Sequence, residues 1–292
     1  MKHNCRRGFS LIEMLIALTI SVGVGAAMVS LLSSSTRFEE RNESQRSARL
    51  VARSAVNVLV NDLRMIDPAW GIDSATTTSL RVKSPYAIGM VCDTTAKLTI
   101  VLLPVDSVSF ATSGYSGIAW RSTGGTYTAV AGGTLATQAG FATSACYIAG
   151  DSIKPISAPA SAPNQKTINA TISGTSRTGI KRGTVILLYR RVNFYFANSA
   201  LAGLTSRTAL WRNYLDSGAG ASELVAPFDS SAAFNFYISG SSAATGTPPG
   251  TLSTLRGFRL FLPGQSENTP RQRIAPETAN LTTAVYFLNA AS

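Results

Sequence analysis

A glycine followed by a long apolar run with a single acid is the part of the sequence best placed for specific chemistry. Gly8 and Phe9 stand directly after a basic pair, and Glu13 lies four residues beyond Phe9. Residues 9–32 form a run of 24 residues whose only charge is Glu13. As a helix this run is about 36 Å long, enough to cross a hydrocarbon core of about 30 Å. A carboxylate there is costly unless it finds a partner, so Glu13 is a candidate functional residue.

The charges ahead of the apolar run predict its orientation. Lys2, Arg6 and Arg7 precede it, so the positive-inside rule keeps the N-terminus cytoplasmic and places the rest of the chain outside. A secretory signal peptide cut near residues 25–27 and an ordinary single-pass anchor share this pattern. Glu13 argues against the signal peptide, because an ordinary apolar segment gains nothing from an acid, and the single-pass anchor stays an alternative. The helical pattern also continues well past residue 27.

The contiguous stretch Arg6-Arg7-Gly8-Phe9-Ser10-Leu11-Ile12-Glu13-Met14-Leu15 resembles the class III signal of type IV prepilins and secretion pseudopilins. In that family a membrane-embedded peptidase cuts after the glycine and methylates the new N-terminal residue. The resemblance implies that residues 1–8 are a cleaved leader, that the cut falls between Gly8 and Phe9, and that Phe9 becomes N-methylated. It covers the first tenth of the chain.

Cleavage at this point would also supply a partner for Glu13. The new α-amino group of Phe9 is a cation, and its pairing with Glu13 of the same or a neighbouring subunit would neutralise both groups in apolar surroundings. The penalty for an unpaired carboxylate would then favour docking into a filament in one register. This assembly role of Glu13 is a hypothesis.

The chemistry available to the rest of the chain is limited. The one histidine, His3, lies in the proposed leader, so the mature chain has no imidazole for a catalytic triad, a Cys-His pair or a His-ligated zinc site. Residues 174–181 approach a phosphate loop, but Ile180 separates the glycine from Lys181, and a surface turn explains them better. We therefore predict a non-enzymatic protein without cofactor or metal.

The cysteines predict at most one disulfide in the exported part. Cys5 lies ahead of the cut, which leaves Cys92 and Cys146. An oxidising periplasm permits a bond between these two, and free buried thiols are the alternative.

The formal net charge of +11 raises the question of an anionic ligand. Removal of the three leader cations leaves +8, which would attract DNA or an anionic surface. No Lys/Arg cluster is dense enough to form a patch, and a basic surface without a dedicated ligand explains the excess. The aromatic residues of 189–196, with Arg190 and Arg191, suit stacking on nucleic acid, but packing of a strand explains them more simply.

The helical pattern continues beyond the apolar run to about Ile66. Residues 37–43 alternate in charge as on a solvated helix face. An apolar stripe then recurs at three- and four-residue spacing in Val56, Leu59, Val60, Leu63 and Ile66. Asp67-Pro68 is a natural stop. We expect one helix over residues 9–66, about 85 Å long, with 9–32 in the membrane or filament core and 33–67 against a head. Gly23 and Gly25 would let it bend or pack closely.

Residues 68–292 are predicted to form a β-rich globular head. A clear alternation places Phe258, Leu260 and Leu262 on one face, and residues 184–189 suit a strand covered on both faces. Residues 107–179 are rich in Gly, Ser, Thr and Ala and are predicted to be a loop insertion of the head. The fold class is therefore α+β, with a long helix packed on an antiparallel sheet in a pilin-like arrangement. We expect strands at 79–83, 98–103, 185–196, 208–212, 233–238, 255–262 and 281–288.

The order of the C-terminal strands resembles that of W-type minor pilins and J-type minor pseudopilins. The segments that carry this resemblance are 185–196, Ala209-Leu-Trp-Arg-Asn, Glu223-Leu-Val-Ala, Phe234-Asn-Phe-Tyr, 252–262 and the final strand at 281–289. It implies a minor subunit that primes or caps a type IV pilus, or a J-type subunit of a type II secretion system. A DNA-uptake or adhesion subunit is a further class, and an exported enzyme is disfavoured by the missing histidines.

The resemblance also implies partners and a location. The partners would be the prepilin peptidase, other minor pilins or pseudopilins, and the major pilin through helix packing. The chain would sit in the bacterial inner membrane with a periplasmic head before it moves to the tip of the filament. Nucleic acid remains an open partner.

Overall fold

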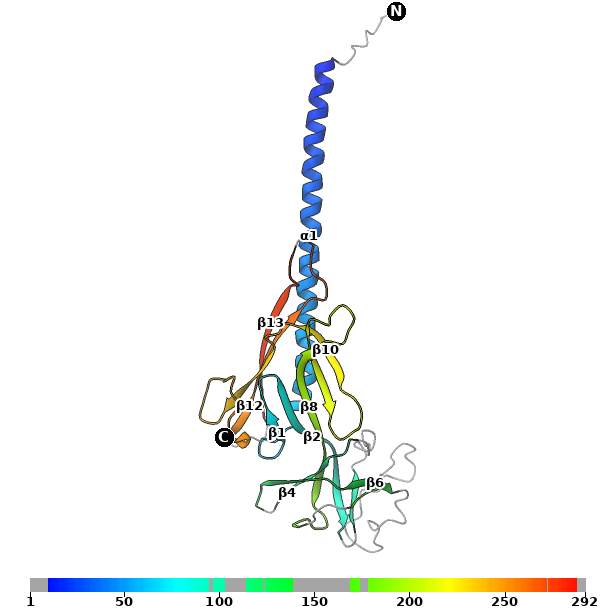
Figure 1. Cartoon of the computed structure of the whole chain (residues 1–292), viewed down its shortest axis with the longest axis vertical. Coiled ribbons are helices and arrows are strands. Elements are labelled where there is room, and N and C mark those ends of the chain that lie inside the picture. Colours follow the sequence, from blue (N-terminus) through cyan, green and yellow to red (C-terminus); the bar gives the residue numbers. More distant parts are fainter. Residues whose placement is uncertain are drawn as a thin grey trace, which may run out of the picture.

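The structure is a computed structural model that describes residues 10–94, 97–102, 114–122, 124–138, 169–173, 178–271 and 273–287. These residues form one long helix, α1 (Leu11–Leu63), followed by a β-rich head that packs on its second half (Figure 1). The strands are β1 (Ile72–Ala75), β2 (Ser79–Asp93), β3 (Leu98–Leu102), β4 (Gly117–Arg121), β5 (Tyr127–Ala131), β6 (Thr134–Gln138), β7 (Asn169–Ser173), β8 (Val185–Asn198), β9 (Thr208–Tyr214), β10 (Ser222–Phe228), β11 (Ala233–Ile238), β12 (Leu255–Gln265) and β13 (Thr278–Tyr286), with a short 3₁₀ turn, η2 (Leu252–Thr254), before β12.

The described strands form one antiparallel sheet with the order β11-β12-β10-β9-β8-β2-β3-β7-β6. Three further pairings complete it: β1 pairs with β2, β13 with β12, and the β4–β5 hairpin joins β8 through β4. β2 and β8 are the longest strands, at 15 and 14 residues, and pair along most of their length. They connect the part of the sheet that packs on α1 to the part that lies beyond the end of the helix.

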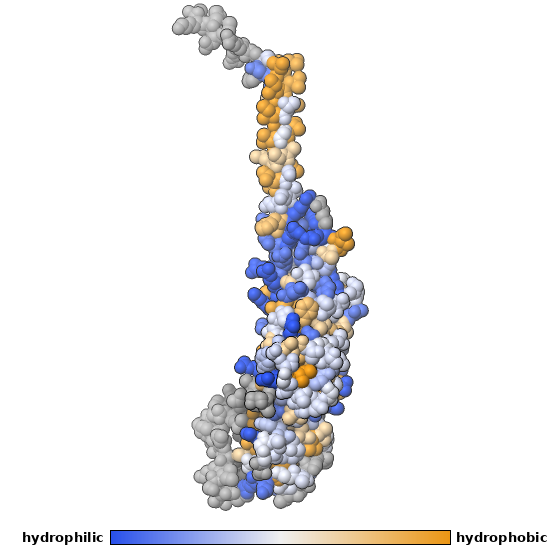
Figure 2. All heavy atoms as spheres, turned by 90° about the vertical axis from the view of Figure 1, so that its left-hand side faces the viewer, coloured by the Kyte–Doolittle hydropathy of each residue, from blue (hydrophilic) through white to orange (hydrophobic). Residues whose placement is uncertain are grey.

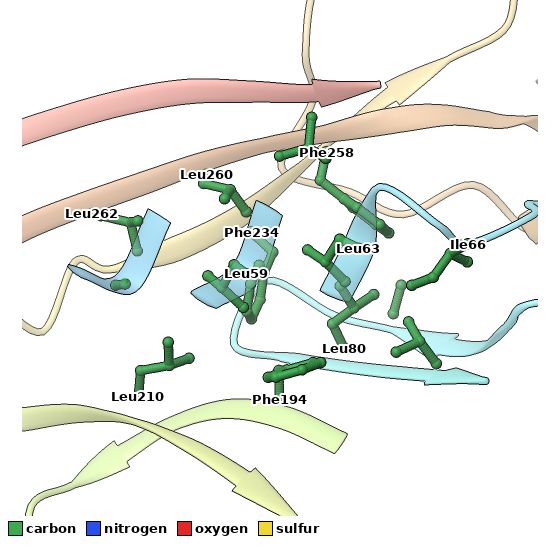
Figure 3. Packing of buried hydrophobic residues seen from close by; sticks show 14 of the residues in the cluster. Leu59, Leu63, Ile66, Leu80, Phe194, Leu210, Phe234, Phe258, Leu260 and Leu262 are labelled. Atoms are coloured by element: carbon green, nitrogen blue, oxygen red, sulfur yellow. The ribbon is translucent and has the colours of Figure 1, made fainter. Parts of the chain in front are cut away.

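The helix is continuous from Leu11 to Leu63, close to the predicted 9–66, and it passes through Gly23 and Gly25 without a break. Its last turns pack into the larger hydrophobic core, against residues of β2, β8, β11 and β12. Figure 3 shows Leu59 and Leu63 between side chains of β12 on one side and of β2 and β8 on the other. Three of the five residues in the predicted stripe are fully buried, and Val56 and Val60 are half-buried at its flank.

Small residues extend the buried face of α1 toward the N-terminus. Ala48, Ala52 and Ala55 are fully buried, and sequence analysis did not predict this because alanine is a weak signal of burial. The reason for their small size is the close approach of β12. A Cβ added to Gly264 would fall onto the backbone carbonyl oxygen of Ala48 and lie 3.2 Å from the Cβ of Ala52. The helix and β12 therefore touch backbone to backbone at this point.

A second hydrophobic core lies beyond the C-terminal end of α1. β3 to β7 and the adjoining ends of β2 and β8 form this distal lobe, which Figure 1 shows at the end of the molecule opposite the N-terminal half of α1. On β8, Ile186 and Leu188 face this core, while Tyr189 faces Trp70 and Ala119 on the other side. The prediction that this part of β8 is covered on both faces is confirmed for residues 186–189, whereas Val185 is 55% exposed.

The predicted strands are all present, and β11 has the predicted bounds. β2 and β12 extend beyond the prediction, to Asp93 and Gln265. Phe258, Leu260 and Leu262, which were predicted to share one face of a strand, are fully buried. Strands β4, β5, β6 and β7 lie within residues 107–179 and were not predicted, because their five-residue segments carry few large apolar side chains. β1 was missed for the same reason.

An ion pair with bidentate geometry joins three separate segments at the boundary between the two cores. The Arg191 guanidinium of β8 donates to both carboxylate oxygens of Asp216, over 2.9 and 2.6 Å. Ser116, just before β4, donates its hydroxyl to the same carboxylate and accepts from the Arg191 backbone N–H. Hydrogen bonds from Arg191, with a smaller contribution from Ser116, lower the pKa of Asp216 although partial burial opposes this.

The contact at Gly264 leads to the first prediction. Gly264→Ala should lower the free energy of unfolding of the head by about 1–3 kcal/mol, because the helix must move away from β12 to admit a methyl group. Thermal unfolding of the full chain in detergent, followed by near-UV circular dichroism, measures this. Gly250→Ala is the matched control, since no atom lies within 4 Å of the added Cβ there. Equal melting temperatures of the two variants would contradict the prediction.

The second prediction concerns pH. The pKa of Asp216 is lower in the folded chain than its ordinary value of 3.8, so the carboxylate stabilises the fold above that value and loses this effect as the pH falls through the folded-state pKa. Asp216→Asn should cost about 1 kcal/mol at pH 7. The gap in melting temperature from wild type should close as the pH drops below 3.8. Glu267→Gln, at an exposed position, serves as the control; a gap that is independent of pH would contradict the role of the charge.

Candidate functional site

The N-terminal half of α1 is an apolar rod that no other described part of the chain covers. Figure 2 shows this hydrophobic segment projecting beyond the hydrophilic middle of the molecule. Its large side chains, from Leu11 to Leu32, are 52–82% exposed. By length and composition, α1 is the one helix among the described residues that could cross a membrane. Apolar side chains exposed at this density need a surrounding that is not water.

Two hydroxyl groups of the rod donate to carbonyl groups of the same helix. The Thr19 hydroxyl donates to the Ile16 carbonyl over 2.9 Å, and Ser33 donates to Ser30 over the same distance. A hydroxyl that bonds back to its own helix carries no unsatisfied donor into an apolar medium. Together with the intrahelical backbone bonds, these contacts make the segment suitable for lipid or for a bundle of similar helices.

The first turn of α1 is closed by a reciprocal pair of hydrogen bonds. Ser10 is the N-cap, and its hydroxyl accepts from the Glu13 backbone N–H over 3.3 Å. The Glu13 carboxylate in turn accepts from the Ser10 backbone N–H over 3.0 Å. This capping box satisfies two of the amide groups that a helix start leaves unpaired. The carboxylate also lies at the positive end of the helix dipole, which stabilises a negative charge.

This geometry gives Glu13 a local role that sequence reasoning did not identify. The sequence Ser10-Leu11-Ile12-Glu13 has the Ser-x-x-Glu spacing of a capping box, and this spacing is the signal that would have predicted the cap. One carboxylate oxygen accepts from Ser10, so the group keeps capacity for a second donor. Lys2, Arg6, Arg7, Gly8 and Phe9 lie outside the described residues, and the cut and the methylation remain predictions.

Two ion pairs mark where the rod ends and the head begins. Glu40 lies 3.5 Å from Arg271, and Arg41 lies 3.6 Å from Glu277, between α1 and the segment that leads into β13. Both pairs have a partner that is largely exposed, so each contributes at most a small stabilisation. The neighbouring charges at Arg37, Glu39 and Glu43 are exposed, in agreement with the predicted solvated face.

The two remaining candidate groups have different outcomes. Cys92 lies on β2 and Cys146 lies outside the described residues, so the disulfide between them stays a prediction. On β8, Arg190 stacks on Tyr86 with 4.1 Å from its guanidinium carbon to the ring centre, and Arg191 is paired with Asp216. Tyr189 and Phe194 are fully buried. Packing within the fold therefore accounts for Tyr189, Phe194, Arg190 and Arg191, whereas Tyr195 is half-buried.

The comparisons with known proteins agree with this N-terminal geometry. Residues 3–29 match the family model described as the prokaryotic N-terminal methylation motif. No curated protein and no solved structure matches the chain. The motif covers the start of the chain only, and together with the long apolar helix packed on an antiparallel sheet it makes the chain type IV pilin-like.

The capping box leads to the third prediction. Ser10→Ala removes the acceptor of the Glu13 amide and should weaken the first turn by about 1 kcal/mol, which corresponds to about fivefold faster amide exchange. Hydrogen–deuterium exchange of the full chain in detergent measures this at residues 11–14. Ser33→Ala, which removes a hydroxyl from the middle of α1, should leave exchange in the first turn unchanged. Equal exchange of the first turn in wild type and Ser10→Ala would exclude the cap.

Proposed function

We propose that this protein is a minor pilin-like subunit, cut between Gly8 and Phe9 and methylated at Phe9, that helps to prime or cap a type IV pilus filament. The observation that carries the proposal is the start of α1. The matched motif ends in an uncovered apolar helix whose first turn holds Glu13 beside the proposed new N-terminus. The orientation, with the leader cytoplasmic and the head periplasmic, follows from the leader charges.

The capping box sharpens the assembly role of Glu13. In its own subunit the carboxylate is held by the Ser10 amide, one residue from the proposed α-amino group of Phe9. The acid and the new amine would therefore lie at the same end of the helix. A neighbouring subunit would meet both charges together, so its own charged terminus would find a partner in one register only.

The distal lobe supports a position at the tip. It extends the head beyond the end of α1, along the direction of the helix (Figure 1). In a shaft of parallel helices that are displaced along their axes, an extension of this kind would occupy the place of the next head. At the tip no further head follows. The same lobe makes a compact J-type subunit of a secretion system the less favoured candidate.

Mass spectrometry of the membrane-extracted chain tests the proposal, and this is the fourth prediction. The mature chain should begin at Phe9 with one added methyl group. A start near Met28 would instead show cleavage by a signal peptidase, and retention of residues 1–8 would show an ordinary membrane anchor. Either result would overturn the processing step.

The same cells test the role of Glu13. Glu13→Ala should reduce the amount of the protein in the sheared filament fraction by about tenfold or more, since a lost charge pair in apolar surroundings exceeds about 1.4 kcal/mol. Glu39→Ala removes an exposed acid of the same helix and should assemble normally. Wild-type incorporation of Glu13→Ala would exclude the pairing role but would leave the processing step intact.

A further inference from the structure

The face of the sheet that points away from α1 carries an ordered row of polar side chains. Because partners in an antiparallel pair share a face, the registers Ser74↔Arg81, Arg81↔Asn193 and Asn193↔Asn213 place four polar residues side by side. On the opposite face of the same strands, Val82, Phe194 and Leu210 are buried against the helix. The row crosses β1, β2, β8 and β9, and three strand spacings make it about 14 Å long.

Most hydrogen-bonding groups of this row are unused within the described part of the chain. Ser74 and Arg81 are exposed, and Asn193 and Asn213 are half-buried. The one side-chain bond in the row is that from the Ser79 hydroxyl to the Asn193 carbonyl oxygen, 2.9 Å long. The Asn193 amide N–H₂ group, the whole Asn213 amide and the Arg81 guanidinium remain available. The row therefore presents both donors and acceptors to a ligand.

Two aromatic rings lie directly beside the row. Tyr195 and Trp211 are cross-strand partners on the same face, with ring centres 6.3 Å apart and planes only 12° from parallel. The Trp211 indole N–H donates to the Asn198 carbonyl over 3.2 Å, which fixes the ring. Both side chains are half-buried, although the buried aromatic residues of this region lie on the helix side. Ser74, Arg81, Asn193, Asn213, Tyr195 and Trp211 together form the outer-face patch.

The charges around the outer-face patch cancel. Lys83 is 2.9 Å from Asp73, and Arg191 is paired with Asp216. Arg81 is the one charged residue within the patch, and no ion pair holds it among the described residues. Glu223, the cross-strand partner of Trp211, adds a carboxylate at the edge of the patch, where it accepts from the Ser199 hydroxyl and the Ala200 N–H. A nucleic acid gains most of its affinity from unpaired cations. With Glu223 counted, the patch and its edge carry no net charge, which disfavours a polyphosphate and fits an uncharged ligand with many hydroxyl groups.

From this arrangement we propose that the outer-face patch binds a neutral, linear, β-linked oligosaccharide. The sugar rings present apolar C–H faces to Tyr195 and Trp211, and their hydroxyl groups bond to the amides of Asn193 and Asn213 and to Arg81. The face lies opposite α1, so packing of the helix against other helices does not cover it. The proposal goes beyond the filament role and does not depend on it.

Tryptophan fluorescence gives a direct test, since the chain has three tryptophans and Trp211 is the half-buried one. Trp70 and Trp120 are 7% and 4% exposed. The full chain in detergent is titrated with hexasaccharides of β-1,4-linked glucose, N-acetylglucosamine and mannose. At least one should change the emission in a saturable way that depends little on salt. No change with any of the three at about 1 mM would overturn the proposal.

Variants test whether the ligand binds at the outer-face patch. Because Trp211→Leu removes the fluorophore, its affinity is measured by isothermal titration calorimetry. Trp211→Leu and Asn213→Ala should each weaken binding about tenfold. Arg259→Ala and Tyr286→Leu, at exposed positions of β12 and β13, should bind as wild type. Circular dichroism checks that each variant is folded. If Trp211→Leu does not fold, the affinity of Asn213→Ala alone tests the proposal. Unchanged affinity of Asn213→Ala, or tighter binding of a single-stranded oligodeoxynucleotide that is lost at high salt, would overturn the assignment.

Discussion

The burial of α1 is the constraint on which the rest of the structure depends. Its second half is covered by the chain's own sheet, and its first half is covered by nothing in the described part of the chain. The free energy of exposing so many apolar side chains to water is large, since each costs on the order of 1.5–3 kcal/mol. The first half of α1 is therefore shielded from water only in a membrane or among other helices. The capping box of the first turn and the back-bonded hydroxyl of Thr19 satisfy polar groups that such surroundings would penalise.

The covered half of α1 packs closely on the sheet. At Gly264 the helix and β12 meet without intervening side chains, which explains why Ala48 and Ala52 continue the buried face. The larger residues Leu59 and Leu63 follow where the sheet curves away and its aromatic side chains fill the space (Figure 3). The head is thereby attached to α1 over several turns. It can carry the distal lobe on the long β2–β8 pair without further contact to the helix.

The sheet has two faces with different tasks. The inner face is apolar and holds the helix, while the outer face carries the ordered polar row, two parallel rings and balanced charges. A single strand shows both: in β8, Val192 and Phe194 point to the helix, and Asn193 and Tyr195 point away from it. This alternation lets one element contribute to attachment and present a surface to the outside.

The sequence alone determined the N-terminal motif, the extent of α1, the sheet class of the head and the strands with clear alternation, such as that of Phe258, Leu260 and Leu262. These features are local, since a few neighbouring residues carry the whole signal. Only the tertiary structure decided the contact at Gly264, the distal strands β4 to β7, and the alignment of Ser74, Arg81, Asn193 and Asn213. Each of these joins residues far apart in the chain. Strand register brings such residues together, and no single segment contains that information.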